Sequence, residues 1–368
     1  MSDLLLLNPG AGQNYQGVAA NAPAIAPPTW ILLLADFCRR EGHGVAIYDA
    51  NIQGWDEGSA KEVLKKFDPR LIVIWVAGHN PSASTQTMPI AGKIARDIKA
   101  VAPEVKIAMG GVHPSALPER TLAEEAINHV IVGEGFQAIS RLSRYLQAYQ
   151  EKGQCYKDPL LDPEADLHGY AWDLLGGGLD AYRCHDHHVF QDAGNRGPYA
   201  TLYTSLGCPY SCNFCVTPGF FGPGPVRYWS VETVVRWIDD LVVRHSVRNV
   251  RIEDEIFLFD LKRVEAICDL LIERGHDLNL WCYGRVRKYP QELLRKMKRA
   301  GFTWICLGIE SAKGKTLHDS IECVRSIQRA GISVMGNFMF GLPGEHQEDM
   351  EATLRLALKL QCEAVNFY

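Results

Sequence analysis

Three closely spaced cysteines are the residues of this 368-residue chain whose types and spacing best suit chemistry. Cys208, Cys212 and Cys215 form the pattern CxxxCxxC. Three thiolates on one short loop can bind three irons of a four-iron, four-sulfur cluster, and the fourth iron then has no protein ligand. A closed structural zinc site needs a fourth ligand, which His185 or His187 can supply. The spacing alone therefore leaves both kinds of metal site open.

The elements around this loop favour the cluster. From residue 199 onward, six short apolar runs alternate with helical patterns, which predicts most of a (β/α) barrel. The active site of such a barrel lies at the carboxyl ends of its strands, and the cysteine loop follows the first of them. The chain stops on the sixth strand, so we expect a partial (β/α)6 barrel over 199–368, with a C-terminal part absent.

The first part of the chain has a different pattern. Over residues 1–151, strand-like runs such as LLLLNP and LIVIWVAG alternate with helical segments. This alternation predicts right-handed crossovers and a doubly wound parallel sheet of the α/β class, with loops for ligands at its carboxyl edge. Residues 152–198 have no regular period, and we interpret them as an interdomain linker.

Composition and charge limit the classes of function. No apolar stretch reaches the length of a membrane span, and the first residues do not resemble a signal peptide. The net charge of -5, without a broad basic face, makes a nucleic acid an unlikely partner. The 11 cysteines, an odd number without an export signal, favour a reducing, cytoplasmic location over a disulfide framework.

The second part of the chain resembles the radical S-adenosylmethionine (SAM) superfamily. The family's cluster motif has an aromatic residue before its last cysteine, here Phe214, which by this resemblance lies against the adenine of SAM. The acidic run RIEDEIFLFDLKR and the segments WCYGRV, LGIES and GNFMFGLPGE follow in the family's order at successive strand ends. The further SAM contacts that the resemblance implies are Asp254, Glu255, Arg285, Glu310, Ser311, Gly341 and Pro343.

The first part resembles the cobalamin (B12)-binding domain that precedes the barrel in one group of this superfamily. The resemblance rests on residues 27–50 and on the segments MGGVHPS and VGEG. Where methionine synthase-type proteins carry DxHxxG, this chain has Asn51 in place of the histidine, so we expect cobalamin without a histidine lower ligand. The implied cobalamin contacts are Asn51, Gly110, Gly111, His113, Gly133, Glu134 and Gly135.

These resemblances imply a radical SAM enzyme with a [4Fe-4S] cluster, SAM and cobalamin as cofactors. The leading interpretation is a methyltransferase that acts on an unactivated carbon of a small-molecule or natural-product substrate, through a 5′-deoxyadenosyl radical and methylcobalamin. An external electron donor such as flavodoxin or ferredoxin is then required. The alternatives are a cobalamin-dependent enzyme that performs cyclisation, ring rearrangement or oxidation, a radical SAM enzyme without cobalamin, and a non-enzymatic iron–sulfur or zinc sensor.

Overall fold

The chain folds into two compact units. The computed structural model describes residues 3–10, 24–77, 81–146, 153–189, 195–222, 224–313 and 317–368. The first unit comprises residues 1–182, 207–211 and 215–227, and the second comprises 183–206, 212–214 and 228–368. The segment between 152 and 198 is therefore divided at residue 182, and most of the residues around the cysteines group with the first unit.

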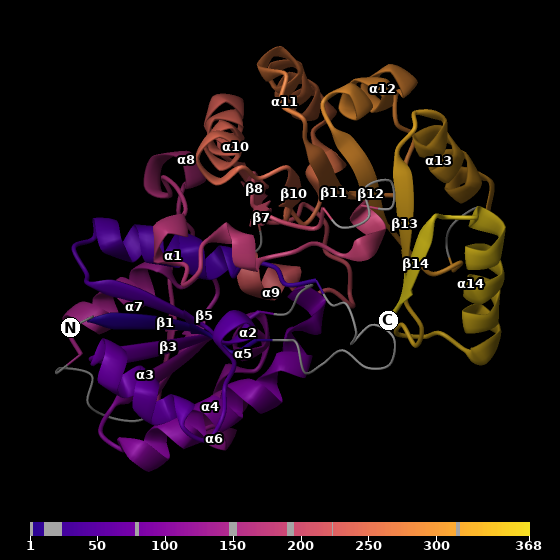
Figure 1. Ribbon diagram of the computed structural model, residues 1–368. Helices are drawn as coiled ribbons and strands as arrows, with labels where there is room; N and C mark the ends of the chain where they lie inside the picture. Colours follow the sequence, from indigo (N-terminus) through magenta and orange to yellow (C-terminus); the bar gives the residue numbers. More distant parts are fainter. Residues whose placement is uncertain are drawn as a thin grey trace. The chain divides into compact units, whose positions relative to one another are not determined.

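A six-stranded parallel sheet forms the centre of the first unit, in the order β2-β1-β3-β4-β5-β6 (Figure 1). Its strands are β1 (Leu4–Asn8), β2 (Val45–Asp49), β3 (Leu71–Val76), β4 (Lys106–Gly111), β5 (His129–Val132) and β6 (Gln154–Lys157). β1 and β3 are apolar runs that are buried along their whole length, as strands covered on both faces must be. The doubly wound sheet that the sequence predicts is confirmed.

Helices cover both faces of this sheet. α3 and α4 pack their apolar side chains into one core cluster with β1, β3 and β4, while α1 contacts α7. The helices of this unit are α1 (Thr29–Arg40), α2 (Ala50–Gln53), α3 (Ser59–Phe67), α4 (Met88–Val101), α5 (Val112–Ala116), α6 (Pro118–Glu124), α7 (Phe136–Arg144), α8 (Pro163–Asp166) and α9 (Thr217–Phe221).

The segment interpreted as a linker contains more structure than its sequence indicates. β6 pairs in parallel with β5 and extends the first sheet. Three short 3-10 turns follow α8, namely Trp172–Leu174, Leu179–Ala181 and Asp186–Val189. Alternation of polar and apolar residues is too short in QCYK to predict a strand, and only pairing with β5 stabilises it.

The second unit is a parallel sheet whose strands follow one another in sequence order, β14-β13-β12-β11-β10-β7. The strands are β7 (Tyr199–Leu202), β10 (Asn249–Ile252), β11 (Asn279–Arg285), β12 (Phe302–Glu310), β13 (Ser333–Phe338) and β14 (Ala364–Phe367). Each strand pairs with the next one along the chain, without the reversal of order seen in the first sheet. This is the partial (β/α)6 barrel predicted from the sequence.

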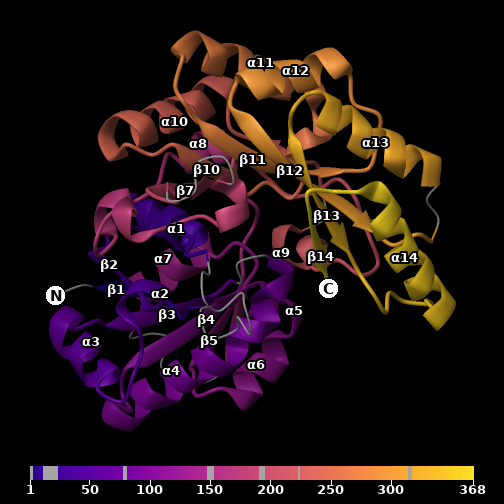
Figure 2. The same ribbon diagram turned by 45° about the vertical axis from the view of Figure 1, so that its right-hand side comes forward.

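Helices separate these strands and lie along one face of the sheet in both views (Figures 1 and 2). They are α10 (Val231–His245), α11 (Leu261–Arg274), α12 (Gln291–Arg299), α13 (Leu317–Arg329) and α14 (Gln347–Leu360). Two two-residue strands, β8 (Ser205–Leu206) and β9 (Arg227–Tyr228), stand before and after the cysteines in the sequence. In the described ranges, no helix has the length and apolar character that crossing a membrane requires.

Candidate active site

The cysteine loop runs from β8 to α9 without regular structure. The thiols of Cys208 and Cys212 are partly buried and that of Cys215 is exposed. The sulfur of Cys215 lies 3.2 Å from Oγ1 of Thr217, the first residue of α9. All 11 cysteines lie in the described part of the chain, and none of them forms a disulfide there. Three accessible thiols on one loop are a donor set that fits an iron–sulfur cluster.

The histidines that the zinc alternative invoked are held by aromatic packing. The rings of His185 and His187 stack with centroids 5.0 Å apart, and the ring of His187 lies 5.4 Å from that of Trp304. Burial lowers the pKa of His185 to about 3 and that of His187 to about 4. In the described ranges, neither these histidines nor the three cysteines of the loop are grouped around a metal position.

Asp254 holds the chain segment that leads into the cysteine loop. Its carboxylate accepts hydrogen bonds from the backbone N–H groups of Thr204 (2.5 Å) and Ser205 (3.1 Å), and from both hydroxyls at 2.6 Å. A carboxylate offers about four acceptor positions, and these four bonds fill them. The side chain is 1% exposed, and burial raises its pKa above the usual carboxyl value. The structure therefore gives Asp254 a positioning role, whereas the resemblance implied a contact with SAM.

Arg263 joins the two ends of the excursion that carries the cysteines. One guanidinium nitrogen donates to the carbonyl oxygens of Thr204 (2.9 Å) and Trp229 (3.0 Å), and the other donates to the hydroxyl of Thr204 (3.1 Å). Its guanidinium also lies over the ring of Tyr228, 5.0 Å from the centroid. Residues 204 and 229 bracket all three cysteines, so Arg263 and Asp254 together fix where the loop leaves and rejoins the barrel.

Glu255 and Arg285 lie near the carboxyl edge of the barrel. Glu255 is partly exposed, whereas Glu253 and Asp254 before it are buried. Glu253 forms an ion pair with Arg251 inside the barrel. Arg285 ends β11 and is partly exposed, and its carbonyl accepts a hydrogen bond of 2.7 Å from the hydroxyl of Tyr289. Of this acidic run, Glu255 and Asp260 are thus partly or fully exposed, whereas Glu253 and Asp254 are buried.

The end of β12 is bent by a register shift. The pairing of β12 with β13 shifts between Gly308 and Glu310, and Glu310 adopts a left-handed backbone with φ of 65°. Such a conformation is uncommon for a residue other than glycine. A Cβ on Gly308 would lie 2.6 Å from Oε1 of Glu310, so the glutamate side chain folds back over Gly308. Bulges of this kind turn a strand-end side chain toward a site.

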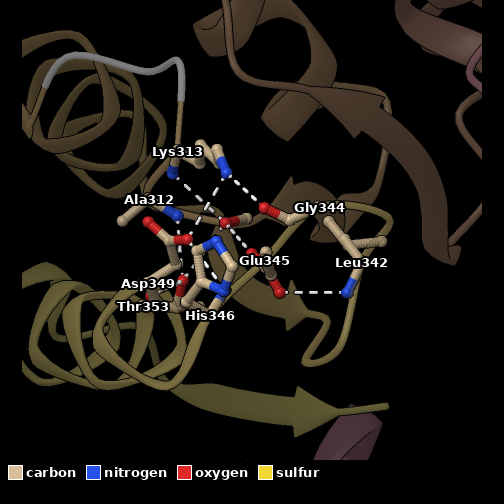
Figure 3. Close-up of polar contacts among 9 residues, drawn as sticks. Ala312, Lys313, Leu342, Gly344, Glu345, His346, Asp349 and Thr353 are labelled. Atoms are coloured by element: carbon tan, nitrogen blue, oxygen red, sulfur yellow. Dashed lines mark hydrogen bonds and ion pairs between the residues drawn. The ribbon is translucent and has the colours of Figure 1, made fainter.

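A polar network joins the segment after β12 to the segment after β13 (Figure 3). The hydroxyl of Ser311 donates to the carboxylate of Glu345, whose other oxygen accepts from the backbone N–H of Leu342 at 3.0 Å. Nζ of Lys313 donates to the carbonyl of Gly344 at 2.6 Å. The hydroxyl of Thr353 in α14 accepts from the N–H of Ala312 at 3.0 Å. Two of the segments that the resemblance placed near SAM are therefore held together.

The turn that carries Gly341 and Pro343 is exposed, and its conformation requires glycine at both ends. Gly341 has φ of 73° and Gly344 has φ of 77°. No atom lies within 4 Å of where a Cβ would be at either position. The Leu342 hydrogen bond to Glu345 closes this turn. Glu345 was not singled out from the sequence, although it ends the GNFMFGLPGE segment that was.

In the first unit, a buried carboxylate lies where the cobalamin motif would begin. Asp49 ends β2 and accepts hydrogen bonds from the side-chain amide of Asn8, the N–H of Asn51 and the hydroxyl of Tyr182, at 2.8 to 2.9 Å. Burial raises its pKa. Asn51 lies against Gly10, since a Cβ on that glycine would come 3.1 Å from Oδ1 of Asn51. The Asp49 carboxylate anchors Tyr182, a contact that the sequence did not reveal.

The glycines predicted to surround cobalamin are required by packing. A Cβ on Gly110 would lie 2.5 Å from the ring of Trp75, and one on Gly111 would lie 2.1 Å from the carbonyl oxygen of Val76. A Cβ on Gly135 would meet Ile131 at 2.8 Å and Trp75 at 3.0 Å. β4 and β5 both end at these glycines, so the glycine-rich loops lie at one edge of the sheet as predicted. Because glycine has no side chain, these loops present their peptide groups at that edge.

Ser115 and Glu134 organise the same edge. The hydroxyl of Ser115 donates to the carbonyl of Gly111 at 2.6 Å and accepts from the N–H of Gly133 at 2.9 Å, which links the two glycine loops. The carboxylate of Glu134 pairs with Arg227. His113 has a ring nitrogen 3.0 Å from the hydroxyl of Thr85, in keeping with a polar loop. These loops lie at the carboxyl edge of the sheet, which is where doubly wound sheets bind their ligands.

Comparison with known families assigns both units. A model of the B12 binding domain matches residues 15–143, and a model of the radical SAM superfamily matches residues 202–357. An uncharacterized methyltransferase of Pyrococcus horikoshii is 28% identical to this chain. The aligned region covers 93% of this chain and 75% of that relative. The anaerobic magnesium-protoporphyrin IX monomethyl ester cyclase of Cereibacter sphaeroides is 25% identical over 96% of this chain and 60% of its own length.

Among solved structures, the radical SAM methyltransferase TsrM of Kitasatospora setae, solved with cobalamin and a [4Fe-4S] cluster, has the same fold. It superposes with a TM-score of 0.72 at 18% identity and covers 100% of this chain and 72% of that one. The chain thus spans 60 to 75% of the length of these three relatives. The strand orders of the two sheets agree with the fold expected from the sequence. The two family models agree with the expected family.

Loss of the Arg263 clamp should weaken cluster binding. In Arg263→Met, the carbonyls of Thr204 and Trp229 lose a donor and buried Asp254 loses the nearby positive charge. Removing one partner of a buried ionic group typically costs about 3 kcal/mol or more. We expect at least a severalfold loss of iron per chain after anaerobic gel filtration. Arg299→Met, which removes an exposed arginine, is the control, and equal iron in both variants would contradict the clamp.

Substitution of Gly111 should unfold the edge of the first sheet locally. Gly111→Ala places a methyl group against the carbonyl of Val76 at φ of 112°, whereas Gly153→Ala has a similar φ of 120° but nothing within 4 Å. We expect amide exchange in peptides of β3 and β4 to be faster by a factor equivalent to at least about 2 kcal/mol in Gly111→Ala. Equal exchange of these peptides in the two variants would contradict the predicted clash with Val76.

Proposed function

This chain belongs to the cobalamin-binding branch of the radical SAM superfamily, and on that premise we propose that it methylates an unactivated carbon of a small molecule. The observation that carries the proposal is the pairing of two folds, a B12 binding domain on one parallel sheet and a radical SAM barrel with its three-cysteine loop on another. When bound, the cluster with SAM supplies a one-electron route to a substrate radical, and cobalamin supplies the methyl group. An sp³ carbon without a lone pair cannot be methylated by simple displacement, and this pair of cofactors meets that difficulty.

The residues of the barrel hold and position the first set of cofactors. We infer that Cys208, Cys212 and Cys215 each ligate one iron and leave the fourth iron for the amino and carboxylate groups of SAM. Phe214, next to the last cysteine, lies against the adenine in this proposal. The other SAM contacts come from the strand ends of the barrel, namely Glu255, Arg285, Glu310, Ser311, Gly341 and Pro343. Asp254 contributes indirectly, by fixing the segment that leads to Cys208.

The loops of the first unit are proposed to receive cobalamin through their backbone. Gly110, Gly111 and Gly133 to Gly135 present peptide groups without side chains at the carboxyl edge of the sheet. Asn51 takes the place of a histidine ligand, and an amide is a poor ligand for cobalt. The carboxylate of Asp49 is occupied by Asn8, Asn51 and Tyr182, so it is not available to orient an imidazole. Both observations support cobalamin without a histidine lower ligand.

We also propose an external one-electron donor, of the flavodoxin or ferredoxin class, for this chain. The cluster loop supports this, because the thiol of Cys215 and the ring of Tyr210 are exposed on it. A cytoplasmic location belongs to the same proposal, and the 11 unbridged cysteines support it. The substrate is proposed as a small molecule or natural product.

A cyclising enzyme is the second candidate. The relative from Cereibacter sphaeroides is a cyclase and is similar over 96% of this chain. The two reactions differ in mass balance, because methylation adds one CH2 unit to the substrate whereas ring closure removes hydrogen. The methyltransferase relatives favour methylation.

Reconstitution should give both cofactors in one chain. With iron, sulfide and hydroxocobalamin supplied anaerobically, we expect about four irons and about one cobalt per chain, and 5′-deoxyadenosine after addition of SAM and dithionite. Cys212→Ala should lose most of the iron and the deoxyadenosine while keeping cobalt, whereas Cys155→Ala, which removes an exposed cysteine outside the loop, should keep all three. Zinc without sulfide in the wild type would contradict the proposal.

The cobalt should have no histidine nitrogen ligand. We expect the electron paramagnetic resonance spectrum of the cob(II)alamin form to be the same whether the protein carries 14N- or 15N-labelled histidine. The reason is that Asn51 stands at the ligand position and Asp49 already accepts three hydrogen bonds within the protein. A change in superhyperfine splitting on labelling would show that a histidine binds the cobalt and would refute the expectation.

A further inference from the structure

We propose that α9 and Arg227 form a bridge that couples the position of Cys215 to the glycine loop of residues 132–135. The bridge comprises residues 217–222 and 224–227, which follow the cysteine loop and belong to the first unit. The inference rests on the proposed function, since the glycine loop is proposed to contact cobalamin and Cys215 to ligate the cluster. It adds a positioning role for Arg227, Phe220 and Phe221 that the motifs did not indicate.

A buried ion pair is the first contact of the bridge. The guanidinium of Arg227 donates to both carboxylate oxygens of Glu134, one of them at 3.3 Å, and to the carbonyl of Leu161 at 2.6 Å. The side chains of Arg227 and Glu134 are 16% and 4% exposed. Burial raises the pKa of Glu134, and Arg227 opposes this effect. The pair is thus shielded from water. Its attraction offsets the cost of desolvation only while the two groups keep this hydrogen-bonded geometry.

Aromatic packing is the second contact. The ring of Trp30 lies 5.1 Å from that of Phe220 and 5.6 Å from that of Phe221, both edge to face. Phe220 also meets Trp75 at 6.2 Å. All four rings are buried, at 5% exposure or less. Edge-to-face packing restricts both the distance between two rings and their relative angle. These contacts therefore give α9 a defined orientation within the first unit.

A close approach of two backbones is the third contact. Gly133 has φ of 81°, and a Cβ there would lie 3.2 Å from the carbonyl oxygen of Phe220. The glycine therefore lies directly against α9. Gly133 was predicted to contact cobalamin. In the structure, a side chain at this position would point toward the bridge.

The glycine loop is also held from within the sheet. Nε1 of Trp30 donates to the carbonyl of Glu134 at 3.0 Å. The N–H of Gly133 donates to Ser115, which in turn donates to the carbonyl of Gly111. Trp30 thus contacts the loop and α9 at the same time. A displacement of the loop is therefore expected to shift α9, because Trp30 contacts both directly.

At its other end the bridge begins at the third cysteine. The thiol of Cys215 contacts the hydroxyl of Thr217 at 3.2 Å, and Thr217 is the first residue of α9. Phe220 follows within the same helical turn. The structural path from the last cysteine to the glycine loop is therefore one short helix. We therefore expect a ligand that orders the glycine loop to order the bridge as well, and a weakened bridge to lower the affinity for that ligand.

Hydrogen exchange with hydroxocobalamin as the probe tests this coupling. In the full chain with its cluster, cobalamin binding is followed by corrin absorbance, and amide exchange is measured for peptides within 215–227. We expect exchange in the wild type to slow by at least about tenfold on binding, which corresponds to about 1.4 kcal/mol. Arg227→Met should still bind cobalamin but show less than half of this slowing on a logarithmic scale. Arg227→Lys should recover part of it.

Arg355→Met is the matched control, because it removes an exposed Arg–Glu pair with Glu351. It should leave the protection of 215–227 as in the wild type. Corrin absorbance without protection in the wild type, or equal protection in all variants, would overturn the bridge while leaving cobalamin binding intact. Absence of corrin absorbance in the wild type would overturn the proposed function itself, and the coupling with it, so the two failures are distinguishable.

Discussion

Burial of the Asp254 carboxylate is the constraint on which the site of the barrel depends. A carboxylate removed from water needs its hydrogen bonds replaced, and here the donors are the N–H and hydroxyl groups of Thr204 and Ser205. Arg263 contributes the compensating charge and also closes the two ends of the cysteine excursion. The loop that carries the three thiols therefore leaves the barrel from a stem that cannot shift without exposing a buried charge.

The first unit uses the same device at its own edge. Glu134 and Arg227 are a second shielded pair, and Asp49 is a third buried carboxylate whose partners are neutral. In each case the acidic group fixes a chain segment that belongs to a different part of the sequence. The segments so fixed, 204–205, 182 and 217–227, all border the predicted cofactor loops. Rigid placement of loops by buried polar groups suits an enzyme that must keep two reactive cofactors in register.

Several motif residues have internal contacts besides the ligand contacts proposed for them. Gly110 and Gly135 accommodate Trp75, Gly133 accommodates α9, and Asp254 is saturated by backbone and hydroxyl donors. The motif positions were identified from the sequence, but their roles were not, because a glycine is equally suited to admit a ligand or a neighbouring indole ring. Arg263 and Glu345 lie within the motifs but were not predicted as site residues. Their roles depend on contacts with residues far along the chain, Thr204 and Ser311.

The sequence by itself determined the order of strands and helices, the two parallel sheets and the loop with its three cysteines. Those features depend on local patterns: continuous apolar runs, helical periodicity and the spacing of thiols. Tertiary structure decided which polar groups are consumed internally and which remain for ligands, the pairing of QCYK with the first sheet, and the attachment of α9 to the first unit. These outcomes depend on burial and on partners far along the chain, such as Tyr182, which lies 133 residues after Asp49, and no local pattern encodes them.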